Sequence, residues 1–138
     1  MLDLFAGSGQ LGIEALSRGA KSAAFVDKSS ASINIVKKNL VVTDFLNQAT
    51  VTNCEYSLFL AKTTEQFNIA FLDPPYKSGV LIDALQKTER VMANNGIIVC
   101  EHPLGVEMPS DVGSFYLHKG YKYGKVFVTI YRAKELDQ

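Results

Sequence analysis

A short apolar run that leads straight into a glycine-rich turn is the feature that most constrains this chain. Residues 1–6 are apolar apart from Asp3, and Gly7, Gly9 and Gly12 follow with the spacing G-x-G-x-x-G. Between a strand and a helix, such glycines let a ligand approach the backbone at the positive end of the helix. The pattern predicts a nucleotide-containing cofactor, and it is shared by sites for NAD, FAD and S-adenosylmethionine.

Two acids narrow the choice of cofactor. Asp27 closes the next apolar run, where a carboxylate can hold both hydroxyls of a ribose. Asp3 lies inside the first run, just before Gly7, which is awkward for a dinucleotide site but suits a cofactor with a charged amino-acid tail. The sequence therefore favours S-adenosylmethionine over NAD.

Short apolar runs alternate with amphipathic stretches along most of the chain. Strands are predicted over residues 1–6, 22–26, 50–53, 68–72 and 97–100. Helices are predicted from the glycine turn to Arg18-Gly19, from Ser29 or Ser30 with an inner face of Ile33, Val36 and Leu40, and over residues 81–92 with a stop at Asn95-Gly96. Residues 114–118 and 125–132 form an antiparallel pair around the turn region 120–124. This order predicts an α/β sandwich with a mostly parallel sheet, in which ligands bind at the carboxyl ends of the strands.

An acid followed by two prolines ends the predicted strand 68–72. Proline fixes φ and lacks an N–H group, so Asp73, Pro74 and Pro75 form a stiff loop. The loop can present the Asp73 carboxylate and the Pro74 carbonyl oxygen as two fixed acceptors for one –NH₂ group. Tyr76 then offers a ring on which a planar base can stack, a contact worth about 1–3 kcal/mol. The sequence predicts methylation of the exocyclic amine of a nucleic-acid base at this loop.

Composition excludes several other classes of protein. The 138 residues leave room for a single domain, and no apolar run or leader predicts a membrane span or a signal peptide. Fourteen basic and fourteen acidic side chains balance, which argues against binding nucleic acid by bulk charge alone. Cys54 and Cys100 lie far apart and predict two reduced, buried thiols rather than a metal site, in a cytoplasmic protein.

With these motifs in place, the chain resembles the RsmD family, which methylates N2 of a guanine in bacterial small-subunit ribosomal RNA. The resemblance rests on Leu-Asp-Leu-Phe-Ala-Gly-Ser-Gly at 2–9, Gly-Ile-Glu-Ala-Leu-Ser-Arg-Gly at 12–19, Asp-Pro-Pro-Tyr at 73–76 and Tyr-Lys-Tyr-Gly-Lys at 121–125. It implies a Rossmann-like class I methyltransferase with a seven-stranded sheet, an antiparallel last strand and helices on both faces. It also implies small-subunit ribosomal RNA or the assembling small subunit as partner, without metal or membrane. Family members carry a segment before the first strand, so we expect this sequence to be a truncated form of a longer protein.

The expected site residues form two groups. The cofactor-binding group is Asp3, Phe5, Ala6, Gly7, Ser8, Gly9, Asp27, Lys28, Asn53, Glu55 and Tyr56. The catalytic group, which by resemblance holds a base flipped out of its stack, is Asp73, Pro74, Pro75 and Tyr76. For Glu55, acceptance from an adenine amine and a solvated loop position both stay open.

Several features of the chain allow more than one interpretation. The terminal pair mixes cations with tyrosines, which suits RNA contacts but equally suits an edge strand protected by lysines. His102 lies on the active side of the predicted sheet, although a structural histidine is the commoner interpretation. A loop of this kind also serves adenine-N6 and cytosine-N4 methyltransferases, and protein-glutamine methyltransferases carry Asn where this chain has Asp73. From a different class, a non-catalytic cofactor-binding or ribosome-assembly protein also fits the pattern.

Overall fold

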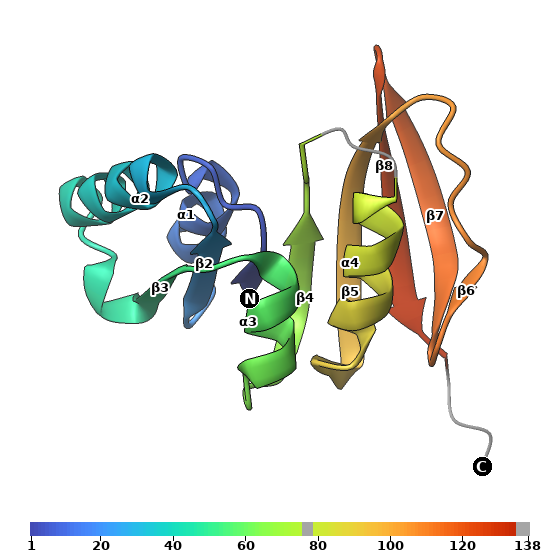
Figure 1. Ribbon diagram of the computed structural model, residues 1–138, viewed down its shortest axis with the longest axis horizontal. Coiled ribbons are helices and arrows are strands. Elements are labelled where there is room, and N and C mark those ends of the chain that lie inside the picture. Colours follow the sequence, from blue (N-terminus) through green and yellow to red (C-terminus); the bar gives the residue numbers. More distant parts are fainter. Residues whose placement is uncertain (76–78, 135–138) are drawn as a thin grey trace. The chain divides into compact units, whose positions relative to one another are not determined.

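The computed structural model describes residues 1–75 and 79–134. The chain divides into two compact units, residues 1–63 and residues 64–138. Both are α/β units in which helices lie against strands (Figure 1). Each unit is described by itself.

The first unit alternates strands with helices. Its elements are β1 (Leu2–Asp3), α1 (Gln10–Ser17), β2 (Ala23–Asp27), α2 (Ser30–Val42), η1 (Leu46–Gln48), β3 (Ala49–Asn53) and α3 (Tyr56–Lys62). The strand β2 pairs in parallel with β1 on one side and with β3 on the other. Parallel neighbours joined through helices bring the carboxyl ends of the three strands to one edge.

The core of this unit forms where α1 and α2 pack on β2. Phe25 is fully buried in a cluster with Leu16 of α1 and with Val36 and Leu40 of α2. The predicted inner face of α2 is confirmed, since Ile33, Val36 and Leu40 are all buried. The N-cap of α2 is Ser29, whose hydroxyl accepts from the Ser32 N–H at 3.2 Å.

Gly12 packs directly against the ring of Phe25. A Cβ added to Gly12 would overlap the Cε1 and Cζ atoms of Phe25. This glycine therefore lets α1 approach β2 closely, and its absent side chain leaves room for the aromatic ring.

The second unit begins with a strand–helix–strand segment and ends with antiparallel strands. Its elements are β4 (Phe67–Leu72), α4 (Val80–Glu89), β5 (Met92–Pro103), β6 (Asp111–Val112), β7 (Phe115–Tyr123) and β8 (Val126–Ala133). The strands β4 and β5 are parallel, whereas β8 is antiparallel to both β5 and β7. Tyr131 of β8 is fully buried, and its hydroxyl donates to the Pro109 carbonyl oxygen at 2.7 Å.

Three sequence-based boundaries are corrected by the structure. The helix predicted over residues 81–92 ends at Glu89, and Met92 already pairs with Phe67 as the first residue of β5. Asn95-Gly96 therefore lies inside β5 and is not a helix stop. The pairing of β5 with β4 is irregular there, since Phe67 pairs with Met92 but Ile69 pairs with Ile97. The turn predicted over residues 120–124 is shorter, because β7 continues to Tyr123. Also, α3 and η1 were not predicted.

The predicted fold class is confirmed. Parallel strands alternate with helices, and the last strand runs antiparallel to its neighbours. Among the described residues there are eight strands in place of seven, and the additional one is the two-residue β6.

Substitution of Gly12 by Ala should destabilise the protein. Alanine favours a helix by about 1 kcal/mol over glycine, but overpacking against Phe25 costs about 1–3 kcal/mol. We expect a net loss of about 1 kcal/mol in the free energy of unfolding, measured in urea. Gly12→Ala is also measured in a protein that carries Phe25→Leu, where the ring that the new methyl group would meet is absent. An equal cost of Gly12→Ala in both backgrounds would contradict the packing argument.

Candidate active site

The eleven cofactor-binding candidates all lie in the first unit, at or beside the carboxyl ends of β1, β2 and β3. They are Asp3, Phe5, Ala6, Gly7, Ser8, Gly9, Asp27, Lys28, Asn53, Glu55 and Tyr56. The fold thus brings residues that are distant in the sequence to one edge, as parallel strands joined through helices require.

Asp27 connects three segments at this edge. Its Oδ2 accepts from the Gly7 N–H at 2.9 Å, and its Oδ1 accepts from the Ser29 N–H at 2.9 Å. Its backbone carbonyl accepts from the Asn53 side-chain amide at 3.0 Å and from the Cys54 N–H at 3.0 Å. These bonds connect Asp27 to the glycine turn, the start of α2 and the end of β3. Asp27 is only half-buried, so its carboxylate stays partly accessible.

Asp3 supports the first turn of α1, directly after the glycine turn. It is 2% exposed, and its Oδ2 accepts from the Gly12 N–H at 3.2 Å. The glycine turn itself needs glycine at two positions, since Gly7 has φ 57° and Gly9 has φ 83°. Open space surrounds the position where a Cβ of Gly7 would lie.

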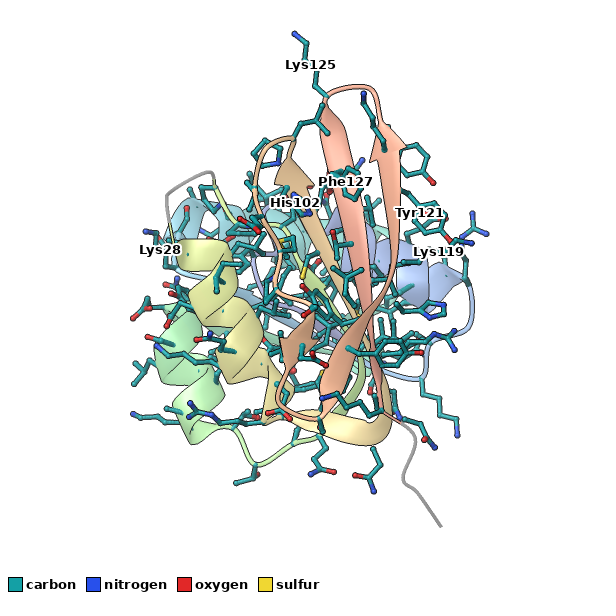
Figure 2. All side chains as sticks on the ribbon, turned by 90° about the vertical axis from the view of Figure 1, so that its right-hand side faces the viewer. Lys28, His102, Lys119, Tyr121, Lys125 and Phe127 are labelled. Carbon is teal, nitrogen blue, oxygen red and sulfur yellow. The ribbon has the colours of Figure 1, made fainter. Side chains whose placement is uncertain are left out.

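The remaining candidates in this unit differ in their surroundings. The rings of Phe5 and Tyr56 lie with centroids 5.3 Å apart at a tilt of 49°. Glu55 is the N-cap of α3, because its Oε1 accepts from the Ser57 N–H at 3.3 Å and from the Ser57 hydroxyl at 2.7 Å. Lys28 is exposed on the surface (Figure 2). The exposed position of Glu55 agrees with a solvated loop acid, whereas its role as a helix cap was not predicted.

This set of residues fits a cofactor that contains a nucleoside. The open face of Gly7 allows close approach to the backbone, and Asp27 keeps a half-buried carboxylate at the end of β2, where ribose hydroxyls are commonly held. The ring pair of Phe5 and Tyr56 adds apolar surface at the same edge.

The catalytic candidates lie in the second unit, after β4. Asp73 and Pro75 are exposed and Pro74 is half-buried, whereas Leu72 immediately before them is fully buried. The acid therefore marks the point at which a core strand reaches solvent. Tyr76 lies outside the described residues.

Glu101 is a neighbour of Asp73 that sequence reasoning missed. The Glu101 side chain lies beside the Asp73 carboxyl group. Partial desolvation of the Asp73 carboxyl group raises the pKa of Asp73 to about 6, and the neighbouring Glu101 contributes to the same shift. A signal was present in the sequence, because Glu101 follows the apolar run 97–100 just as Asp73 follows the apolar run 68–72.

A cavity of about 290 Å³ opens beside these residues within the second unit. Pro74, Pro75 and Glu101 form part of its wall, and Leu81 and Ile82 of α4 contribute apolar surface. A cavity of this size, with a few polar groups on an apolar wall, is large enough for a small ligand.

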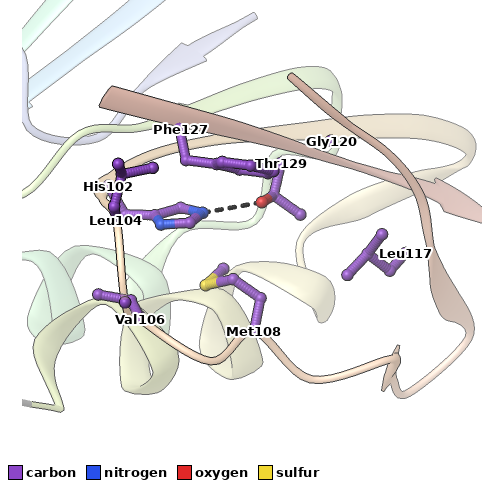
Figure 3. Close-up of a pocket in the computed structure, with 9 residues that line it drawn as sticks. His102, Leu104, Val106, Met108, Leu117, Gly120, Phe127 and Thr129 are labelled. Carbon is purple, nitrogen blue, oxygen red and sulfur yellow. Dashed lines mark hydrogen bonds between the residues drawn. The ribbon is translucent and has the colours of Figure 1, made fainter. Parts of the chain in front are cut away.

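His102 is held in place by its neighbours. Its Nδ1 lies 3.0 Å from the Pro103 carbonyl oxygen, so Nδ1 carries the proton and Nε2 accepts from the Thr129 hydroxyl at 2.8 Å. The ring is 6% exposed and stacks on Phe127 with centroids 5.5 Å apart. Figure 3 shows this arrangement at the wall of a second cavity of about 500 Å³. With both ring nitrogens occupied, His102 has the structural role that was its commoner interpretation.

The cations and tyrosines of the terminal hairpin divide into two kinds. Lys119 Nζ lies 5.2 Å from the centroid of the Tyr121 ring, and Tyr121 stacks with the exposed Tyr123 at 6.3 Å. Lys125 projects from the tip of the hairpin (Figure 2). Lys134 instead pairs with Asp111 at 3.0 Å. The first kind forms an accessible aromatic and cationic surface, and the second stabilises the hairpin.

Further predictions from the sequence concern metals, membranes and thiols. Within residues 1–75 and 79–134, no group of three or more His, Cys, Asp or Glu residues is arranged to hold a metal ion. Among the described residues, no helix is both long and apolar enough to cross a membrane. Cys100 is buried, which raises the pKa of its thiol to about 12, whereas Cys54 is only half-buried, contrary to the prediction of two buried thiols.

Comparison with known proteins adds independent information. The family model described as "Conserved hypothetical protein 95" matches residues 1–132. The Ribosomal RNA small subunit methyltransferase D of Escherichia coli (strain K12) is 34% identical, over 95% of this chain and 67% of its own length. The provisionally named rRNA methyltransferase YlbH of Bacillus subtilis (strain 168) is 42% identical, over 96% of this chain and 75% of its own length.

A solved structure agrees with these relatives. A conserved hypothetical protein of Streptococcus pyogenes has a TM-score of 0.90 and 32% identity, and the match covers 96% of this chain and 84% of that one. The likeness confirms the Rossmann-like fold. Because the family model and the relatives cover nearly the whole sequence, this chain belongs to the RsmD family of methyltransferases.

Proposed function

We propose that this protein transfers a methyl group from S-adenosylmethionine to the exocyclic N2 amine of a guanine in small-subunit ribosomal RNA. The observation that carries the proposal is the position of Asp73, an exposed acid that directly follows the buried last residue of β4, Leu72, and is followed by two prolines. Membership of the RsmD family supports methyl transfer, and the name of the Escherichia coli relative supports ribosomal RNA as the substrate. We further propose that the reaction takes place in the cytoplasm.

The Asp73 loop supplies what an aromatic amine lacks as a nucleophile. The lone pair of such an amine is delocalised into the ring, so the nitrogen attacks poorly. Two fixed acceptors, the Asp73 carboxylate and the Pro74 carbonyl oxygen, can bind its two hydrogens and favour a pyramidal nitrogen. They also stabilise the positive charge that develops on the nitrogen during attack. Tyr76 is proposed to stack on the ring and hold the amine at these acceptors.

The first unit is proposed to hold the methyl donor. Asp27 would bind the ribose hydroxyls, the backbone at Gly7 and Gly9 would lie along the cofactor, and Phe5 and Tyr56 would contact its apolar parts. When bound, S-adenosylmethionine supplies an electrophilic methyl group on a sulfonium. Asp3 is proposed to act on the charged tail through the turn that it supports, since it is 2% exposed and accepts from Gly12 N–H.

The terminal hairpin is proposed to contact the RNA. Lys119, Tyr121 and Tyr123 form a surface with both a cation and ring faces, which suits the phosphates and unstacked bases of a loop. The chain carries no net charge, so this local patch rather than the overall field would attract the RNA.

The substrate is tested with unmethylated small ribosomal subunits, naked ribosomal RNA and DNA, each incubated with the protein and labelled S-adenosylmethionine. We expect label on N2 of guanine in the ribosomal substrates, identified after digestion to nucleosides. A version of the protein extended upstream serves as a second enzyme sample. Label found only in DNA or protein, or on adenine N6 or cytosine N4, would exclude the proposal.

Substitution of Asp73 by Ala should abolish methyl transfer. Loss of one fixed acceptor removes transition-state stabilisation, so the rate should fall by about 100-fold or more. Affinity for S-adenosylmethionine, measured by calorimetry, should change little, because the proposed cofactor residues lie on other strands. Asp27→Ala is the reciprocal variant and should weaken cofactor binding first. An equal loss of cofactor affinity in both variants would show that the roles are divided wrongly.

The rate of transfer should depend on the ionisation of Asp73. A protonated carboxyl group donates a hydrogen and no longer offers both oxygens as acceptors, so activity should be full at about pH 8 and lost as pH falls through about 6. A carboxylate with an ordinary pKa near 4 would keep its activity to a much lower pH. The measurement is kcat between about pH 5 and 9, with cofactor affinity followed over the same range as a control. A kcat that stays constant to the acid end of this range would contradict the assignment.

A further inference from the structure

Asp73 directly follows β4, and Glu101 lies on the neighbouring parallel strand β5, one position beyond the last residue that pairs with β4. The register between β4 and β5 pairs Phe71 with Val99 and Leu72 with Cys100, so the next position along brings Asp73 beside Glu101. Neighbouring strands lie about 4.8 Å apart, and residues at matching positions point to the same face. The two carboxyl groups therefore lie side by side, and the charge of Glu101 acts on Asp73.

Such a pair is unfavourable for the fold alone. Two carboxylates side by side repel each other, and Glu101 raises the pKa of Asp73 by its charge. Among the ion pairs of the described residues, none includes Asp73 or Glu101, so no lysine or arginine there offsets the repulsion. Glu101 is also half-buried and lines the same cavity as Pro74 and Pro75. An arrangement that costs stability at the wall of a cavity indicates a ligand that provides the missing donors.

The missing donors identify the kind of base. In guanine, the N2 amine lies next to the ring nitrogen N1, which carries a hydrogen, so this edge presents adjacent donors. In adenine the N6 amine lies next to a bare N1, and in cytosine the N4 amine lies next to a bare N3. A flipped-out base is read along this edge. Two adjacent carboxylates therefore match guanine, whereas adenine or cytosine would turn a lone pair towards the second carboxylate.

We propose that Glu101 accepts the N1–H hydrogen of the target guanine while Asp73 accepts a hydrogen of its N2 amine. Glu101 is then the residue that makes the site specific for guanine, and it binds the base without taking part in methyl transfer itself. This inference rests on the proposed function and supplies the reason why guanine, rather than another base with an exocyclic amine, is the substrate.

The test compares Glu101→Gln with Glu107→Gln, a matched control that removes one charge from an exposed position of the same unit. The substrates are two copies of one RNA, with guanine or 2-aminopurine at the position that the wild-type protein methylates. 2-Aminopurine keeps the N2 amine but has a bare N1. The measured quantity is the ratio of kcat/KM for guanine to kcat/KM for 2-aminopurine.

The wild-type protein and Glu107→Gln should prefer guanine by about 10- to 100-fold, the range expected for one hydrogen bond to a charged acceptor. In Glu101→Gln this ratio should fall towards one, because a glutamine amide can accept from N1–H or donate to a bare N1. A general loss of stability would lower both rates together and leave the ratio unchanged. A ratio equal to that of the wild type in Glu101→Gln would overturn the inference.

Two further measurements separate the possible failures. If the wild-type protein places no methyl group on N2 of guanine, the proposed function fails, whereas a normal guanine reaction with an unaltered ratio in Glu101→Gln refutes only the role of Glu101. Affinity for S-adenosylmethionine and Tm establish whether Glu101→Gln is folded. Should it be unfolded, Glu101→Asp takes its place. This variant keeps the charge but withdraws it from N1, so the guanine rate should fall selectively, and an unchanged ratio there also overturns the inference.

Discussion

The carboxylate of Asp27 is the interaction on which the arrangement of the first unit depends. One oxygen accepts from Gly7 in the glycine turn, and the other accepts from Ser29 at the start of α2. Hydrogen bonds to a charged acceptor are stronger than neutral ones, so a single side chain fixes two segments firmly. Because its carbonyl oxygen also accepts from Asn53 and Cys54, the edge of three strands is tied together at one residue.

This role changes how the acids of the turn are understood. From the sequence, Asp3 and Asp27 were both predicted to bind the cofactor. In the structure Asp3 is buried beneath the turn and accepts from Gly12, while Asp27 is half-buried with backbone donors on both oxygens. A carboxylate oxygen has two lone pairs, so Asp27 can serve the turn and a ribose together. Asp3 contributes by fixing the backbone of Gly12 in the first turn of α1, directly after the glycine turn.

Local signals in the sequence predicted much of the fold, and the misses have physical causes. Ser29 and the spacing of Ile33, Val36 and Leu40 were sufficient to predict α2, because capping and burial there depend on neighbours in sequence. The end of α4 was misjudged because Met92 continues the helical spacing yet pairs with Phe67, a partner distant in sequence. The short helix α3 escaped notice, since its start depends on Glu55 acting as a cap, a role more often taken by Ser, Thr, Asp or Asn.

For the candidate site too, the sequence was informative where the signal depends on neighbouring residues in the chain. The two prolines after Asp73 single it out in the sequence. Glu101 also follows an apolar run, but its place beside Asp73 becomes evident only from the register of β4 and β5. The repulsion between the two carboxylates does not stabilise the sheet, and a neutral residue at either position would remove this repulsion. Natural proteins depart from local rules mainly where function requires it. The position of Glu101 is therefore better explained by a base that donates to both acids than by the folding of the strands that carry them.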